Sequence, residues 1–418
     1  MLTTDTVVIG AGHAGLAVSR LLTDAGRDHV VIDRGRVAER WRTERWDSLH
    51  LLTPNWMTRL PGWHYPGPDS EAYMAVADLV AHLERYAASF AAPVRTGTTV
   101  LAVTACAGGY RVTTDQGTWA TRHVVVATGP WGRPRVPAGI DLEGSGLVLT
   151  TASRYRNPGA LPDGGVLVVG ASSSGVQIAD ELSRAGRRVV LAAGRHTRMP
   201  RRYRGLDVFW WLERTGRLAR TIDEVRDPAA ARNEPSLQLV GRNEPDRSAE
   251  DLDLAALAGR GVRVTGRLRA VSGGVASFED SLPAAVAESD ARMHRFLDAV
   301  DAHVDAAGLG PEVWEPLRPR PFAVHRVPTR LDLRAEGIGT VLLATGYRPD
   351  HPWLRVPVTG HDGVIRQHRG VTPAPGLYVV GQRFQHRRDS GFIDGARHDA
   401  ESVVTHLASG RPLDPTPR

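Results

Sequence analysis

Short apolar runs alternate with amphipathic stretches along this chain, and their order at the N-terminus is specific. Residues 6–9 are an apolar run typical of a buried strand, and residues 10–15 read Gly-Ala-Gly-His-Ala-Gly. Residues 16–25 then have the periodicity of a helix, and residues 29–33 form a second apolar run. This order predicts a β–turn–α–β unit of about 30 residues.

The same pattern begins again at Gly165. Residues 165–169 form an apolar run, residues 170–175 read Gly-Ala-Ser-Ser-Ser-Gly, a helical stretch runs to Arg184, and residues 188–192 form the next strand. An internal duplication of this kind predicts an α/β fold with two Rossmann-like dinucleotide-binding domains.

The rest of the chain supplies further elements and two connectors. Helices are expected at 73–90, 281–307 and 393–407, and strands at 98–103, 110–113, 123–127, 341–346 and 376–381. Connectors rich in Pro and Gly at 130–137 and 158–165 suit domain boundaries. We predict a discontinuous domain of residues 1–160 and 331–418, and an inserted domain of residues 161–330 with a helical insertion at about 281–308.

The first glycine motif has the chemistry of a dinucleotide site. Gly10 allows the tight turn, Gly12 lets the backbone approach a pyrophosphate, and Gly15 lets helix and strand pack closely. Asp33 ends the strand that follows the helix, where a carboxylate accepts hydrogen bonds from ribose hydroxyls. The helix N-terminus adds N–H donors for the phosphates.

The second motif differs at the position that selects the nicotinamide cofactor. Ser172 replaces the middle glycine, and the position equivalent to Asp33 is Ala193. Five arginines follow within residues 195–204. Guanidinium groups without an acidic neighbour favour a 2′-phosphate, and hence NADPH. The alternative is a solvated basic loop. The predicted contacts to this cofactor are Gly170, Ser172, Ser173, Ser174, Gly175, Arg195, Arg198 and Arg202.

Composition narrows the chemistry further. All 52 basic residues are arginine, which excludes a Schiff-base lysine and the lysine of a Walker A motif. Cys106 is the single cysteine, so a disulfide-reductase thiol pair, an iron–sulfur cluster and a cysteine-rich zinc site are excluded. Two dinucleotide folds point to FAD plus a pyridine nucleotide. We therefore expect a cofactor, rather than a protein side chain, to supply the reactive group, and we expect no metal.

Charge and hydropathy restrict the partners and the compartment. The net charge is +6, but 46 acidic residues are interspersed with the arginines, so we expect no nucleic acid partner. The chain has no long apolar run that could span a membrane and no basic segment before an apolar run at its start. We expect a cytoplasmic protein without a membrane span, and a homodimer is compatible with the sequence.

At this point the sequence resembles the flavin-containing monooxygenase-like family of two-domain flavoproteins, in its bacterial branch near the indole-pyruvate monooxygenases. The resemblance spans nearly the whole chain. It is carried by both glycine motifs, Trp41, and the segments 125–129 (Val-Val-Ala-Thr-Gly), 343–347 (Leu-Ala-Thr-Gly-Tyr) and 376–381 (Gly-Leu-Tyr-Val-Val-Gly).

The resemblance implies roles that spacing alone does not give. The inserted domain would bind NADPH and the discontinuous one FAD, with the two Ala-Thr-Gly turns linking them. Trp41 and Arg42 would lie along the FAD ribityl or pyrophosphate, Val100 near the adenine, and Gly381 with the helix beginning near Ile393 at the isoalloxazine. The other residues placed in cofactor binding are Arg34, Thr128, Gly129, Thr345 and Gly346.

The sequence departs from the family pattern before the second motif. The family's oxygenase motif is Phe-x-Gly-x-x-x-His-x-x-x-Tyr, and here Ser145, Leu147 and Thr151 replace its Phe, Gly and His, while Tyr155 retains its last place. An Asn near the reactive edge of the flavin aligns with Leu52, although Asn55 is close. Asn55, Tyr155 and His386 are the only catalytic candidates.

The sequence thus predicts an FAD- and NADPH-dependent monooxygenase that uses O2 and a C4a-(hydro)peroxyflavin to oxygenate a small molecule. Heteroatom oxidation, Baeyer–Villiger oxidation and hydroxylation all remain open. The departures around Thr151 motivate an alternative, an NADPH-dependent reductase that passes electrons to a quinone or a protein without oxygenation. A third alternative is a non-catalytic flavin-binding redox sensor.

Overall fold

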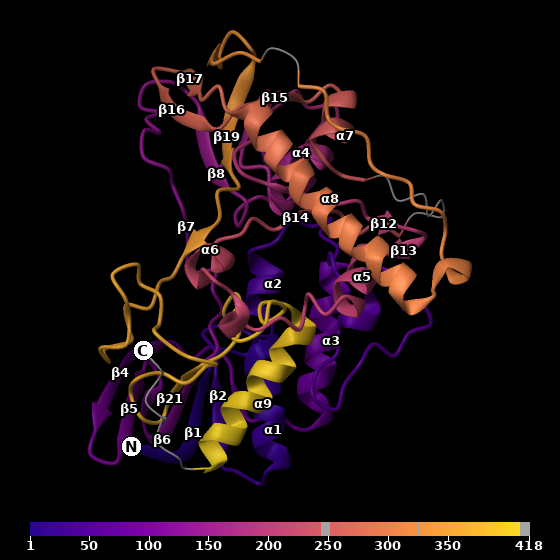
Figure 1. Cartoon of the computed structure of the whole chain (residues 1–418). Coiled ribbons are helices and arrows are strands. Elements are labelled where there is room, and N and C mark those ends of the chain that lie inside the picture. The colour runs from indigo at the N-terminus through magenta and orange to yellow at the C-terminus, as the bar shows by residue number, and fades with distance from the viewer. Residues whose placement is uncertain (244–250, 325–326, 410–418) are drawn as a thin grey trace.

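The computed structural model describes residues 1–243, 251–324 and 327–409, and it contains the two predicted Rossmann-like domains (Figure 1). The first domain is built on a sheet with the strand order β3-β2-β1-β6-β5-β4, and β21 pairs with β6. β1, β2, β3, β6 and β21 pair in parallel, whereas β4, β5 and β6 form an antiparallel meander. The strands are β1 Leu2–Ile9, β2 His29–Ile32, β3 Val94–Arg95, β4 Val100–Cys106, β5 Gly109–Thr114, β6 Gly117–Val126 and β21 Leu377–Val379.

Three helices cover one face of this sheet. They are α1 (His13–Asp24), α3 (Val76–Ser89) and α9 (Ile393–Ser409), and α1 and α9 lie side by side (Figure 1). The central strands are buried on both faces, which explains why they are continuous apolar runs rather than alternating ones. The expected helix at 73–90 begins at Val76, because Ala75 still pairs with His50 in an isolated bridge.

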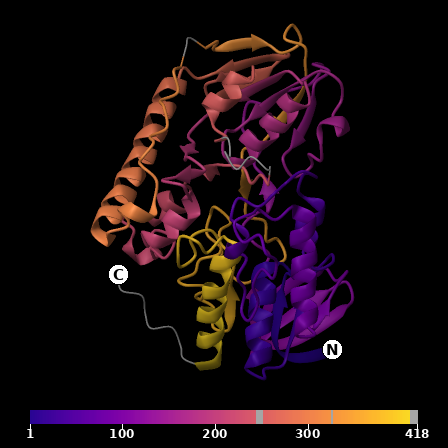
Figure 2. The same cartoon turned by 90° about the vertical axis from the view of Figure 1, so that its right-hand side faces the viewer.

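The second domain has a parallel sheet in the order β15-β10-β9-β19-β8. Its strands are β8 Val148–Thr151, β9 Gly165–Val169, β10 Val189–Ala192, β15 Arg263–Thr265 and β19 Ile338–Leu343. Its helices are α4 Ser173–Arg184, α7 Leu254–Gly259 and α8 Leu282–Ala307, and a small antiparallel sheet consists of β16 Leu268–Ser272, β17 Val275–Phe278 and β18 Arg330–Asp332. The long α8 confirms the expected helical insertion and runs along one side of the molecule (Figure 2).

Two chain crossings join the two sheets. β7 (Arg133–Pro134) pairs antiparallel with β20 (Tyr347–Arg348) between the sheets. β8 and β19 both belong to the second sheet, so sheet membership changes near 133–134 and 347–348 rather than at 160 and 331. Of the two predicted connectors, the one at 130–137 contains β7 of the crossing, and the one at 158–165 lies between β8 and β9 of the second sheet.

The remaining elements are short. They are α2 Glu39–Thr43, α5 Val208–Arg214, α6 Pro228–Arg232, β11 Thr197–Arg198, β12 Arg202–Tyr203, β13 Leu206–Asp207, β14 Leu237–Gln238 and the 3-10 helices η1 Asn55–Met57, η2 Pro158–Ala160, η3 Ile222–Glu224 and η4 Gly310–Glu312. Across the described ranges, we find no helix whose length and apolar character would let it cross a bilayer.

Candidate functional site

A cavity opens at the carboxyl ends of β1, β2 and β6. Gly10 and Gly12 form its floor, Asp33 and Thr128 line it, and Gly381 and Gly391 close it from the C-terminal part of the chain. In parallel α/β sheets, ligands bind at this end of the strands. The duplicated sequence motif therefore lies where a dinucleotide would bind.

The glycines of the first motif are required by their surroundings. Gly10 has a φ of +114°, and a Cβ there would lie 2.6 Å from the Ala127 carbonyl oxygen. A Cβ on Gly15 would lie 1.9 Å from the Gly10 carbonyl oxygen, so this residue permits contact between helix and strand. Gly12 is different, because a Cβ there meets nothing within 4 Å. The space in front of Gly12 is room for a phosphate.

Polar groups around this space fit FAD. α1 starts after Gly12 without a side-chain cap, so the N–H groups of its first turn remain available to an anion. Asp33 already accepts from the Ala11 and Gly35 amides at 2.7 and 2.8 Å, which fixes its carboxylate for ribose hydroxyls. The buried Thr128 hydroxyl has no partner among the described residues. Uncapped donors, an oriented carboxylate and an orphaned hydroxyl together match a dinucleotide.

Most of the predicted FAD residues meet at this cavity, and the others lie beside it. Those that line it are Gly10, Gly12, Asp33, Arg34, Trp41, Val100, Thr128, Gly129 and Gly381. Gly15 packs against the Gly10 carbonyl rather than lining the cavity. Ile393 is the first residue of α9, and the nearby Gly391 lines the cavity in its place. Thr345 and Gly346 lie on the crossing before β20, where the Thr345 hydroxyl donates to the Arg135 carbonyl.

Arg42 also lies outside the cavity lining, and Arg45 takes its place there. Arg42 points away and pairs with Glu84. The Arg45 guanidinium lies 5.1 Å from the centre of the Trp41 ring, and both side chains line the cavity. Burial lowers the pKa of Arg45, which indicates a positive charge that neighbouring carboxylates compensate only weakly. Several arginines precede Arg45 in the sequence, and no spacing rule singled it out.

We expect Arg45→Ala to weaken FAD binding by about 10- to 100-fold, because a charge-assisted hydrogen bond contributes about 1.5–3 kcal/mol. Arg42→Ala is the matched control and should retain FAD at the wild-type level. Equilibrium titration of apoprotein with FAD measures both. The melting temperature of Arg45→Ala apoprotein should not fall, since the variant loses a buried unpaired charge. Equal losses in the two variants would contradict the assignment.

The second motif repeats the geometry of the first. Gly170 has a φ of +109° and a Cβ there would lie 2.5 Å from the Ala344 carbonyl oxygen, while a Cβ on Gly175 would lie 1.8 Å from the Gly170 oxygen. Ser172 precedes α4 but its side chain makes no cap hydrogen bond. Ser173, Ser174 and Gly175 form the uncapped first turn of α4. This is a second anion-binding helix N-terminus, as the duplication predicts.

The predicted arginines after Ala193 differ in their exposure and in their hydrogen-bond partners. Arg195 is exposed after β10 and donates to the Asn233 carbonyl at 2.8 Å. Arg198 is buried between Asp253 and Asp290, at 2.6 and 2.9 Å, so its charge is already neutralised within the fold. Arg202 donates only to the Gly205 carbonyl, at 3.3 Å, and its Nε is buried without a partner among the described residues. Arg195 is therefore the predicted arginine best placed for a 2′-phosphate.

Sequence reasoning missed Arg267 at the same place. The side-chain carbons of Arg267 lie 3.6–3.7 Å from the position of a Cβ on Gly194, and the side chain is exposed. It follows β15, which pairs with β10. Arg195 and Arg267 are far apart in the sequence, so sequence patterns do not reveal that they are neighbours. The parallel pairing of β10 and β15 brings together the loops that follow these two strands.

The three catalytic candidates lie outside the described FAD cavity. Tyr155 is 1% exposed in the core of the second domain and donates to Glu181 at 2.7 Å, so it has a structural role in this fold. The Asn55 amide donates to the Asp69 carbonyl at 2.9 Å, and its Oδ1 is buried without a described partner. His386 lies between Gly381 and α9, and burial lowers its pKa. His386 is therefore neutral at pH 7.

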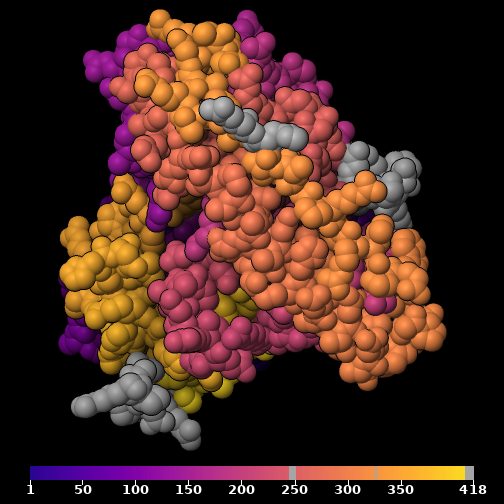
Figure 3. Space-filling view, turned by 45° about the horizontal axis from the view of Figure 1, so that its top comes forward, coloured from indigo at the N-terminus to yellow at the C-terminus, as the bar shows by residue number. Residues whose placement is uncertain are grey.

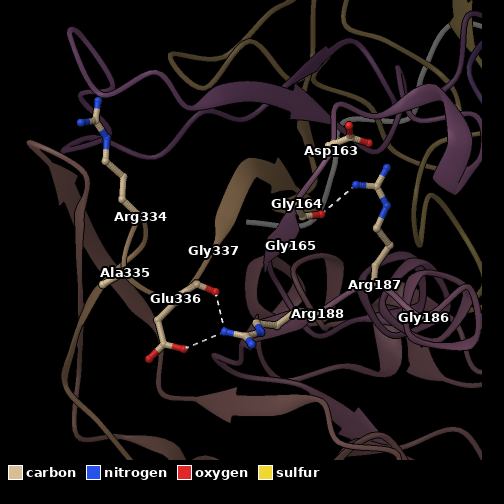
Figure 4. A pocket seen from close by; sticks show the side chains of 10 residues that line it. All are labelled: Asp163, Gly164, Gly165, Gly186, Arg187, Arg188, Arg334, Ala335, Glu336 and Gly337. Carbon is tan, nitrogen blue, oxygen red and sulfur yellow. Dashed lines mark hydrogen bonds and ion pairs between the residues drawn. The ribbon is translucent and has the colours of Figure 1, made fainter.

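A second hollow at the opposite end of the second sheet is not a dinucleotide site (Figure 4). Arg187 there donates to the carbonyls of Pro158, Leu161, Pro162 and Gly164, and Arg188 donates to the Glu336 carbonyl. These guanidiniums hold the loops at the amino ends of the strands. Among the described residues, Arg187 donates to backbone carbonyls alone, and Arg188 also pairs with the Glu336 carboxylate, so these side chains stabilise the domain.

Comparisons with known proteins agree with this geometry. Residues 7–207 match the family described as pyridine nucleotide-disulphide oxidoreductase. A flavin-containing monooxygenase from Stenotrophomonas maltophilia superimposes with a TM-score of 0.66 at 20% identity, covering 98% of this chain and 99% of that one. The similar architecture over both full lengths shows a common fold. The chain thus shares the two-domain fold of this monooxygenase, and its first half is similar to the pyridine nucleotide-disulphide oxidoreductase family.

Two relatives place this flavoprotein more closely. A CzcO-like oxidoreductase from Geobacillus kaustophilus is 29% identical over 96% of this chain and 98% of its own length. The indole-3-pyruvate monooxygenase YUCCA1 from Oryza sativa is 34% identical over 49% of this chain and 51% of its own. The protein is a flavin-dependent oxidoreductase, and the flavin monooxygenases and pyridine nucleotide oxidoreductases to which it is similar use FAD and NADPH.

Proposed function

We propose that this flavoprotein is a monooxygenase that uses NADPH, FAD and O2 to transfer one oxygen atom to a small organic molecule. The fold shared with a flavin-containing monooxygenase over both full chains carries the proposal, and the similarity to an indole-3-pyruvate monooxygenase supports it. Cys106 lies exposed on β4 as the single cysteine, so the thiol pair of a disulfide reductase is absent from the chain.

The protein's own residues would bind and orient the two cofactors. The first turn of α1 would hold the FAD pyrophosphate and Asp33 its ribose, while Gly391, two residues before α9, lines the cavity. The first turn of α4 would hold the pyrophosphate of NADPH. Bound FAD supplies hydride acceptance from NADPH and, once reduced, the reaction with O2. A helix N-terminus beside the flavin would stabilise negative charge on its reduced form.

Anaerobic reduction with NADPH followed by mixing with O2 tests the proposal. We expect an absorbing species distinct from oxidised and reduced flavin, and a product heavier by one oxygen atom in mass spectrometry. Immediate reoxidation to hydrogen peroxide with every compound offered would contradict it. The replacement of His by Thr151 favours the alternative reductase, for which rapid quinone reduction without oxygenated product is the expected result.

The preference for NADPH has its own test. We expect Arg195→Ala to raise KM for NADPH about 10- to 100-fold and to leave KM for NADH nearly unchanged, because the lost hydrogen bond to a 2′-phosphate is worth about 1.5–3 kcal/mol. Arg267→Ala should act in the same direction, and Arg111→Ala on β5 is a control with an exposed arginine far from β10. Equal effects on both cofactors would refute the 2′-phosphate role.

A further inference from the structure

Two aromatic side chains, His351 and Trp353, line the FAD cavity, and no sequence motif predicts them. Their ring centres lie 5.8 Å apart at an interplanar angle of 82°. Thr98 lines the same cavity together with Val100, the first residue of β4. The Thr98 amide donates to the Asp33 carbonyl at 2.8 Å, so the stretch before β4 adjoins the end of β2. The carboxylate expected to hold the ribose therefore lies beside the start of β4.

Backbone hydrogen bonds hold the segment with these two rings beside β4. The Val103 amide donates to the Trp353 carbonyl at 2.8 Å, and the Arg355 amide donates to the Val103 carbonyl at 2.9 Å. The side chains of Trp353 and Val100 pack against one apolar cluster, to which Val103 belongs. Because Val100 and Trp353 also both line the cavity, the rings and the start of β4 bound the same part of it. The side chains of His351 and Trp353 are called the aromatic wall below.

The aromatic wall follows the second chain crossing, and contacts between the two crossings anchor it. The crossings meet at Gly132, where a Cβ would lie 2.4 Å from the Arg348 carbonyl oxygen and 2.5 Å from the Asp350 nitrogen. Arg133 Nε donates to Asp350 Oδ2 at 2.7 Å. In Figure 1 the orange loops after β20 lie above β4 and β5, and Figure 3 shows this part of the chain as a gold lobe at the left of the molecule. The segment is thus fixed at Asp350 on one side of the wall and at β4 on the other.

We propose that the aromatic wall holds the adenine ring of FAD and thereby makes the protein select FAD over FMN, which lacks the adenosine. The inference rests on FAD as the cofactor of the proposed function. The acidic residue after the second strand of a dinucleotide fold binds a ribose, and the one ribose of FAD carries the adenine. With Asp33 on this ribose, the adenine lies at the start of β4, beside the wall.

The two rings have the chemistry that a base requires. Burial lowers the pKa of His351 more than Asp350 and the Gly363 backbone raise it, so the imidazole is neutral at pH 7. A neutral imidazole and an indole both offer a ring face on which a base can stack. Stacking does not depend on the flavin half of the cofactor, so the wall should contribute to the binding of FAD and not to that of FMN.

Equilibrium titration of the full-chain apoprotein with FAD and with FMN tests this assignment, because both carry the same flavin and quenching of its fluorescence reports binding. We expect Trp353→Leu to weaken FAD about 5- to 100-fold, since stacking of a base on an aromatic side chain contributes about 1–3 kcal/mol, and to leave FMN unchanged. His351→Ala should act in the same direction, and Trp353→Phe should retain most of the affinity for FAD. Trp119→Leu is the matched control, because Trp119 packs against the same apolar cluster without lining the cavity.

Three results would overturn the assignment. They are wild-type affinity for FAD in both Trp353→Leu and His351→Ala, equal losses for FAD and FMN, and a loss of FAD in Trp119→Leu as large as that in Trp353→Leu. Where FMN binds the wild type too weakly to measure, the two tryptophan variants are compared in their affinity for FAD alone. Circular dichroism and the melting temperature of each apoprotein establish that the variants fold. The titrations require no turnover, so their failure is distinct from a failure of the monooxygenase reaction.

Discussion

Gly12→Val should give a folded protein that is purified without FAD. Gly12 has a φ of −83°, which valine adopts easily, and a Cβ there meets no atom within 4 Å, so the fold tolerates the side chain. The added methyl groups would fill the space in front of the α1 N-terminus. Loss of two hydrogen bonds from backbone N–H groups to a charged phosphate costs about 3–6 kcal/mol, or 10²- to 10⁴-fold in affinity.

Two further variants separate this effect from damage to the fold. Gly15→Ala should destabilise the apoprotein itself, because its Cβ would lie 1.9 Å from the Gly10 carbonyl oxygen. Gly259→Val, at the end of α7, also points into open space and should keep both fold and flavin. Flavin absorbance of the purified protein and titration of apoprotein with FAD measure the outcome. A yellow Gly12→Val protein with wild-type affinity would show that no phosphate approaches this glycine.

The sequence predicted the two dinucleotide-binding units because their physics is local. A buried strand, a glycine turn and a helix occupy adjacent residues, so Gly10 to Asp33 and Gly170 to Ala192 can be recognised by pattern alone. The predicted strands and helices of both domains appear in the structure with ends shifted by a few residues. Helix ends are set by contacts such as the pairing of Ala75 with His50, which no periodicity contains.

The prediction and the structure differ in properties that depend on contacts between residues distant in the sequence. The strand at 148–151 joins the second sheet through β19, which comes much later in the chain, whereas the sequence placed this strand before the boundary at 160. Arg42 and Arg45 have equal chemistry, and only the fold shows that Arg45 enters the cavity. Arg198 belonged to a plausible phosphate cluster, but Asp253 and Asp290 neutralise it. Residue types were predictable at the site, whereas the direction of each side chain was not.

A buried ion pair at the domain junction should have the largest effect on stability. Arg201 and Asp207 of the second domain are 1% and 2% exposed, and the Arg201 Nε donates to Asp207 Oδ2 at 2.9 Å. Tyr73 of the first domain donates its hydroxyl to the same Oδ2 at 2.7 Å, and the guanidinium lies 4.2 Å from the Tyr73 ring centre. Arg201 also donates to the Leu52 carbonyl at 2.8 Å. The Arg201 guanidinium therefore contacts residues of both domains.

Arg201→Met should lower stability by about 3–5 kcal/mol, because it leaves the Asp207 carboxylate buried without its partner. The expected fall in melting temperature is about 3–6 °C for a chain of this length, measured by calorimetry at equal FAD occupancy. Asp207 Oδ1 also accepts a hydrogen bond from the Phe209 amide and so caps α5. In the double variant Asp207 is therefore changed to Asn, whose side-chain oxygen can still accept this bond. Arg201→Met/Asp207→Asn should recover part of the loss, since no buried charge remains.

The next residue in the sequence provides the control. Arg202→Met removes a half-buried guanidinium whose one described hydrogen bond is to the Gly205 carbonyl, so its melting temperature should stay close to the wild type. If Arg201→Met melted like Arg202→Met, the ion pair would contribute little and the domains would be held by apolar contacts around α5 and α8. If the double variant were as unstable as Arg201→Met, the contacts of Arg201 to Tyr73 and Leu52 would be the cause, rather than the unpaired carboxylate. The recovery in the double variant thus distinguishes a charge that must be compensated from a side chain that joins two surfaces.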